Sequence, residues 1–71
     1  MFSVGQTVHV AVEIDGGRYM SCPYRISEIR GQMLDLVSSS GDKRLLSLYT
    51  RKVSLTQEES FAVCAALNGA L

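Results

Sequence analysis

Four stretches of alternating or dense apolar residues, separated by glycine-containing turns, come before one helix-like segment. The clearest stretch is 7–14, where Val8, Val10, Val12 and Ile14 alternate with smaller or more polar residues. Period-two alternation of β-branched residues is typical of a half-buried strand. This order predicts an antiparallel sheet whose apolar side is covered by a single helix.

Turn signals set the limits of the predicted strands. Glycine tolerates positive φ, so the Asp-Gly-Gly sequence at 15–17 predicts a tight reversal. Pro23 has no N–H group to give to a ladder, so we expect an edge position or a bulge there. We expect strands over 7–14, 18–29, 32–38 and 44–50, with a short fifth strand or a coil over 53–55.

The helix-like segment begins at a capping signal. Thr56 and Glu59 have the spacing of a capping box, and Asn68 followed by glycine is a stop signal, which predicts a helix over 57–68. On a helical wheel one broad side carries Phe61, Val63, Cys64 and Leu67, which we expect to pack on the sheet. The opposite side carries Glu58, Ala62, Ala65 and Gly69.

Short strands joined by tight turns predict a small fold built mainly of β-strands. We expect an α+β fold that is mainly β: an SH3-like, partly open antiparallel barrel of four to five strands with a C-terminal helix over one opening. Residues 1–71 are expected to form a single domain. A chain of this size buries only about 60% of the surface that its unfolded form exposes, so self-association would add stability.

Charge and composition exclude several classes of protein. Seven basic and seven acidic residues cancel, which excludes a dominant basic footprint, although all the basic residues fall within 16–55. No apolar run approaches the roughly 18 residues that span a bilayer, and no secretory signal is expected at the N-terminus. Cys22 and Cys64 are expected to be buried thiols in a reducing compartment, with a disulfide between them as the alternative. We therefore expect a cytoplasmic protein.

No residue pattern predicts catalysis. His9 is the single histidine, and no partner at a suitable spacing accompanies it. The aspartates fall at turns, and Glu58 and Glu59 belong to the start of the helix. We therefore expect no enzyme activity, no cofactor and no metal.

One set of residues has chemistry suited to a partner, because aromatic and arginine side chains on an open sheet can stack bases and contact phosphates. We expect these side chains to project from the outer face of the sheet. The set is Tyr19, Arg25, Tyr49 and Arg51, flanked by Lys43, Arg44 and Lys52. A solvated outer face is the alternative interpretation.

The helix offers a second candidate surface. Ala62, Ala65 and Ala66 are small, so another helix or sheet could approach closely, although alanine is also common on exposed helices because it is the best helix former. The sequence thus predicts a non-enzymatic module that binds a protein partner or itself. If it self-associates, we expect a homo-oligomer, and a dimer in particular. The alternative is binding of single-stranded DNA or RNA through the Tyr/Arg set.

Overall fold

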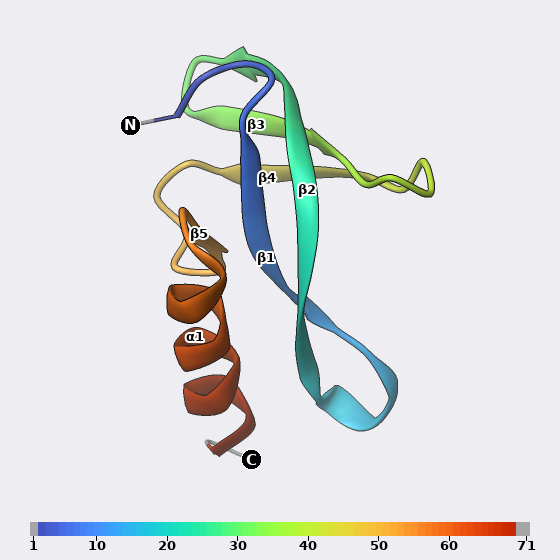
Figure 1. The fold of residues 1–71 in the computed structure, drawn as a ribbon, viewed down its shortest axis with the longest axis vertical. Helices are drawn as coiled ribbons and strands as arrows, with labels where there is room; N and C mark the ends of the chain where they lie inside the picture. The colour runs from blue at the N-terminus through green and yellow to red at the C-terminus, as the bar shows by residue number, and fades with distance from the viewer. Residues whose placement is uncertain (1, 70–71) are drawn as a thin grey trace.

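A single five-stranded antiparallel sheet and one helix make up residues 2–69, the part of the chain that the computed structural model describes (Figure 1). The strand order is β4-β3-β2-β1-β5, so β5 returns to the side of β1. The mainly β, α+β fold expected from the sequence is confirmed. Its elements are β1 (Thr7–Glu13), β2 (Tyr19–Arg30), β3 (Met33–Val37), β4 (Lys43–Ser47), β5 (Val53–Ser54) and α1 (Gln57–Gly69), with a single 3-10 turn at Asp15–Gly17.

The turn between β1 and β2 has the conformation that its glycines allow. Gly16 and Gly17 both have positive φ, at 73° and 76°, which an L side chain rarely adopts. The Ile14 N–H group donates to the Arg18 carbonyl oxygen across the turn at 2.6 Å. The predicted reversal is therefore confirmed.

The long strand β2 serves two parts of the sheet. Residues 19–24 of β2 pair with β1, Arg25 pairs with both β1 and β3, and the rest of the strand pairs with β3. A bulge between Ile26 and Glu28 shifts the register with β3. The Ile26 N–H group donates to the Gln6 carbonyl oxygen, so the backbone groups of Ile26 face the β1 side. Alternation along the strand turns the nitrogen of Pro23 to the other side, where no strand pairs. The predicted edge position of Pro23 is confirmed, and no ladder hydrogen bond is lost there.

The main core lies on the concave face of this bent sheet. Val8 is opposite Tyr24, and Ile26 is opposite Leu36, so the buried side chains share one face. The core consists of Val8, Val10, Val12, Tyr24, Ile26, Leu34, Leu36 and Val53.

Two side chains that alternation along the strands places on the buried face, Ile14 in 7–14 and Met20 in 18–29, lie outside this core. Ile14 is 44% exposed because β1 ends at Glu13, and Met20 is 52% exposed. Met20 lies opposite Val12 in the half of β2 that β3 does not reach, so nothing in the sheet covers it.

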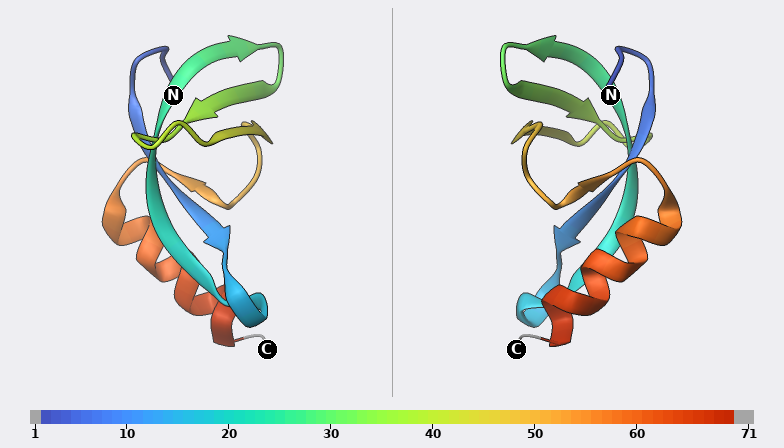
Figure 2. Two further views of the ribbon diagram at one scale, coloured as in Figure 1. Left: turned by 90° about the vertical axis from the view of Figure 1, so that its right-hand side faces the viewer. Right: turned by 90° about the vertical axis from the view of Figure 1, so that its left-hand side faces the viewer.

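The helix packs on the opposite, convex face, which corrects the expectation that it covers the apolar side. Ser21 lies opposite Ala11, and its hydroxyl group donates to Ser60 Oγ in α1 at 2.8 Å. The sequence neighbours Val10 and Cys22 point the other way, into the core. Figure 2 shows α1 on one side of β2 and strands β3 and β4 on the other.

Side-chain size explains this placement. The convex face under α1 carries the buried small residues Ala11 and Ser54, and small side chains allow a helix to approach a sheet closely. On the concave face, β3 and β4 already supply Leu34, Leu36 and Leu46 to the core, so the helix is not needed there.

Capping fixes the start of the helix. Thr56 Oγ1 accepts a hydrogen bond from the Glu59 N–H group at 3.1 Å and donates to Glu59 Oε1 at 2.9 Å. The predicted cap is confirmed, and the helix runs one residue further than expected, to Gly69. The described part of the chain contains no helix long and apolar enough to cross a lipid bilayer.

Candidate interaction surfaces

Polar side chains of α1 face the sheet. Ser60 is fully buried and bonded to Ser21. Asn68 lies at the free edge of β2, where its Oδ1 accepts from the Tyr19 N–H group at 2.7 Å and its Nδ2 donates to the Tyr19 carbonyl oxygen at 3.1 Å. These contacts fix how the helix is rotated about its own axis.

The outward side of α1 is apolar, and we call Phe61, Ala62, Ala65 and Ala66 the α1 outer face. All four are exposed, Phe61 to 54%, so the expectation that Phe61 packs on the sheet is wrong. Its physical cause is the rotation set by Ser60 and Asn68, which turns Phe61 away. Ala62, Ala65 and Ala66 are exposed, as the helical wheel predicted for the side of the helix away from the sheet. From Ser60 to Gly69 the helix has no charged residue.

The two cysteines do not pair. Both are free, with Cys22 packed against the core on the concave face and Cys64 buried beneath the helix. Burial raises the pKa of the Cys64 thiol above its ordinary value, and a hydrogen bond with Ser60 opposes this rise more weakly. The disulfide that the sequence left open is absent from the structure.

Part of the predicted Tyr/Arg set lies near the helix. The Lys52 ammonium group is 5.4 Å from the centre of the Tyr19 ring, across β1. Tyr49 is 73% exposed and Arg51 is exposed, but both lie in the turn between β4 and β5, because β4 ends at Ser47 and not at residue 50. The prediction that they project from the outer face of a strand is therefore wrong.

Arg44 is held at the end of the core. Its Nε donates to the hydroxyl oxygen of the buried Tyr24 at 2.8 Å, and its guanidinium carbon lies 5.9 Å from the ring centre. Arg25 is six residues from Tyr19 along β2, which corresponds to roughly 20 Å. The six candidates thus do not form one set, because Lys52 lies beside Tyr19 whereas Arg25 is far from it along β2. The role in binding of Tyr19, Arg25, Arg44, Tyr49, Arg51 and Lys52 stays a prediction.

Arg25 instead joins a row that crosses four strands. Thr7 pairs with Arg25, Arg25 with Val37, and Val37 with Lys43, so all four side chains project from the convex face. The row places one cation on each side of Val37, Arg25 on β2 and Lys43 on β4. Lys43 was expected only to flank the Tyr/Arg set, because the register that joins it to Arg25 depends on three strands.

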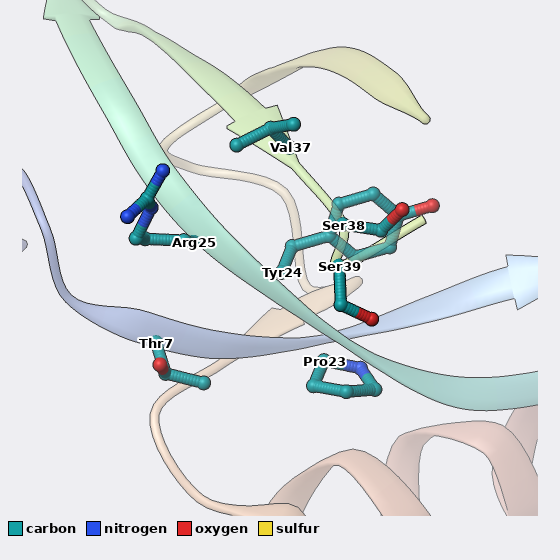
Figure 3. A pocket seen from close by; sticks show the side chains of 7 residues that line it. All are labelled: Thr7, Pro23, Tyr24, Arg25, Val37, Ser38 and Ser39. Carbon is teal, nitrogen blue, oxygen red and sulfur yellow. The ribbon is translucent and has the colours of Figure 1, made fainter. Parts of the chain in front are cut away.

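Two hollows adjoin this row and share Val37. The first has a volume of about 420 Å³ and lies where β2 and β3 diverge (Figure 3). It is lined by Thr7, Pro23, Tyr24, Arg25, Val37, Ser38 and Ser39. The second, of about 500 Å³, is lined by Ser27, Arg30, Asp35, Leu36, Val37, Lys43, Arg44 and Leu45. We call the surface formed by both hollows the fork face.

Asp35, which lines the second hollow, and the nearby Glu28 both form ion pairs with Arg30. Its guanidinium group lies 3.0 Å from Asp35 Oδ1 and 3.9 Å from Glu28 Oε2. The hydrogen bond to Asp35 and the charges of both carboxylates raise the pKa of Arg30 further. Within residues 2–69, Arg25 and Lys43 form no ion pair. Their charges are therefore available to an anionic partner.

Comparison of the chain with protein-family models, with curated proteins and with solved structures finds no match. The packing of α1 and the charges of the fork face are the features from which a function can be argued.

Proposed function

We propose that this chain is a non-enzymatic interaction module that forms a symmetric dimer through the α1 outer face. The observation that carries the proposal is the rotation of the helix, which turns Ser60 and Asn68 inward together with Cys64 and leaves Phe61 outward. A surface helix ordinarily buries its apolar stripe and exposes its charged one. A contiguous exposed apolar face is typical of an interaction site.

A second copy of the chain suits this face better than a charged partner does. The α1 outer face combines one large side chain with three small ones, so Phe61 of one copy can pack over Ala65 and Ala66 of the other under a two-fold axis. Small residues allow two helices to approach to about 8 Å. The four residues of this face carry no charge, and Glu58, which lies on the same side of the helix one turn before Ala62, is the charge that pairing must keep apart from its copy.

The acidic residues set the direction of pairing. Glu58 and Glu59 both lie in the first turn of α1. Parallel helices would bring the acidic turns of the two copies together, whereas antiparallel helices keep them at opposite ends. We therefore expect the antiparallel arrangement.

The dimer should be weak and reversible. α1 has 13 residues and is thus roughly 20 Å long. A helix pair of this length buries less than the roughly 1,200 Å² of a stable interface. We expect a dissociation constant of tens of micromolar or weaker, on the order of −6 kcal/mol.

Sedimentation velocity from about 10 µM to 1 mM tests the dimer against matched variants. Ala65→Glu places a charge in the middle of the α1 outer face and should leave the protein monomeric throughout. Gln57→Glu adds the same charge in the first turn and should dimerise like the wild-type protein. A wild-type monomer at 1 mM, or equal behaviour of the two variants, would exclude the proposed dimer and leave a different protein as the partner.

The finer description of the fold belongs to the same proposal. The order β4-β3-β2-β1-β5, the bent β2 shared between two parts of the sheet, and the return of β5 to β1 support an SH3-like, partly open barrel. The free thiols of Cys22 and Cys64 support a reducing, cytoplasmic location. An experimental structure and localisation of the tagged protein test these two points.

A further inference from the structure

Three fork-face cations form no ion pair with a described acidic residue: Arg44, whose Nε is bonded to Tyr24, and Arg25 and Lys43, whose side chains have no such bond. The fork face lies on a different part of the chain from the α1 outer face. We propose that the fork face binds the phosphates of single-stranded nucleic acid, with Arg25 and Lys43 contacting neighbouring phosphate groups. This inference does not depend on the dimer.

The separation of the two cations indicates a chain-like ligand. Arg25 and Lys43 are two strands apart in one cross-strand row, which places their Cα atoms roughly 10 Å from each other. They line different hollows, which meet at Val37. Two cations placed in this way do not converge on one phosphate, but they suit successive phosphates of an extended strand.

The other lining groups suit a sugar-phosphate backbone. Thr7, Ser38 and Ser39 bring hydroxyl groups to the hollow that Arg25 lines (Figure 3). Arginine, lysine and hydroxyl side chains are the groups that commonly contact phosphate oxygens. They position a nucleic acid without reading its sequence.

Base recognition should be slight. Tyr24 lines the first hollow but is only 4% exposed, so its ring offers no stacking surface. Pro23, Val37 and Leu45 are the apolar side chains available to the bases. Without an aromatic platform, we expect modest affinity and little preference among sequences.

An acidic peptide fits this surface less well than a nucleic acid. The edge of β2 at the first hollow carries Pro23, which has no N–H group to donate, and a peptide added to the free outer edge of β4 would run along β4, two strands away from Arg25. An extended peptide gains much of its affinity from main-chain hydrogen bonds to a free strand edge. A nucleic acid needs none, because its charges lie in its own backbone.

Fluorescence anisotropy with a labelled 12-nucleotide oligo(dT) tests the inference between 25 and 200 mM NaCl. Two phosphate contacts predict a slope of about −1.4 for log K against log salt, or a roughly sevenfold loss from 50 to 200 mM. The Arg25→Gln, Lys43→Gln double variant should bind at least tenfold more weakly at 50 mM, with a slope near zero. Circular dichroism checks that the variant is folded.

The control removes the same charge elsewhere. Arg18 and Arg51 are exposed and line neither hollow, so Arg18→Gln with Arg51→Gln should lower affinity less than threefold. Ala65→Glu, designed to be monomeric, should bind like the wild-type protein. The inference is overturned by absence of wild-type binding at 25 mM, by an equal loss in the control, or by an acidic peptide that displaces the oligonucleotide as well as unlabelled oligo(dT) of equal charge.

Discussion

Ser60, fully buried near the start of α1, accepts a 2.8 Å hydrogen bond from the hydroxyl group of Ser21 on the convex face of β2. Most helix-on-sheet contacts are apolar, and here a serine pair lies at the contact. The pair joins the two hydroxyl groups and holds the helix with Phe61 outward. It therefore connects the packing of α1 to the surface proposed for self-association.

The serine pair should show energetic coupling. Ser60→Ala and Ser21→Ala each remove one partner, and we expect a loss of about 1 kcal/mol from the unmet hydroxyl group. The double variant should lose less than the sum, by about 0.5–1.5 kcal/mol, because neither hydroxyl group is then left without a partner. Urea denaturation of the four proteins measures the coupling. Strictly additive losses would mean that the hydrogen bond contributes nothing to stability.

Asn68 should protect the free edge of β2. Asn68→Ala removes both hydrogen bonds to Tyr19, so the Tyr19 amide hydrogen should exchange with solvent faster, and stability should fall by about 1–2 kcal/mol. Native-state hydrogen exchange followed by NMR measures this. Gln57→Ala at the other end of the helix is the control and should leave Tyr19 protected. Unchanged exchange at Tyr19 in the Asn68 variant would contradict the contact.

The concave core should dominate stability. Leu36 in β3 is 1% exposed, whereas Leu45 in the neighbouring strand β4 is 53% exposed. Leu36→Ala should cost about 2–5 kcal/mol, which is a large part of the total for a chain this small. Leu45→Ala should change stability by less than about 0.5 kcal/mol. Thermal unfolding separates the two, and similar melting temperatures would contradict the assigned core.

Stability should fall at alkaline pH through Cys64. Burial raises the pKa of this thiol in the folded state, so the unfolded chain releases its proton first. The contribution is complete below the unfolded pKa and is lost as pH rises through the higher folded pKa. Urea denaturation between pH 7 and 11 should show this loss in the wild-type protein and a smaller one in Cys64→Ala. Identical pH profiles would rule out the effect.

Asp42 should weaken nucleic-acid binding at the fork face. It directly precedes Lys43, so Asp42→Asn removes an opposing charge near one of the two cations. We expect affinity for oligo(dT) to rise about twofold at 50 mM NaCl, since exposed charge interactions contribute less than about 1 kcal/mol. The anisotropy titration measures it. Weaker binding of the variant would count against a phosphate contact at Lys43.

Most of the secondary structure could be predicted because its signals are local. Alternation around Val8 and Val10, the glycine turn at 15–17, and the cap at Thr56 each act within a few residues. The side of the sheet that α1 covers could not be predicted in this way. It depends on Ala11, Ser21 and Ser54 becoming neighbours across three strands, and on polar contacts that turn Phe61 outward.

The candidate surfaces depend even more on register. The bulge between Ile26 and Glu28 makes Arg25 pair with Val37. Without the extra residue, Arg25 would pair with Ser38, and Lys43 would lie on the opposite face from Arg25. Nothing in the sequence marks this bulge. Exposure of Ala62, Ala65 and Ala66 could be read from the wheel, since it needs only the period of the helix.

The free edge of β2 is closed twice, by the missing N–H group of Pro23 and by the amide of Asn68 at Tyr19. An unprotected edge would let copies of the chain add strand upon strand without limit. With that route blocked at β2, the outer edges of the short strands β4 and β5 are the ones left for strand addition, while a pair formed at the helix closes on itself under its two-fold axis. The edge chemistry of β2 therefore removes one route by which copies of the chain could grow into fibres.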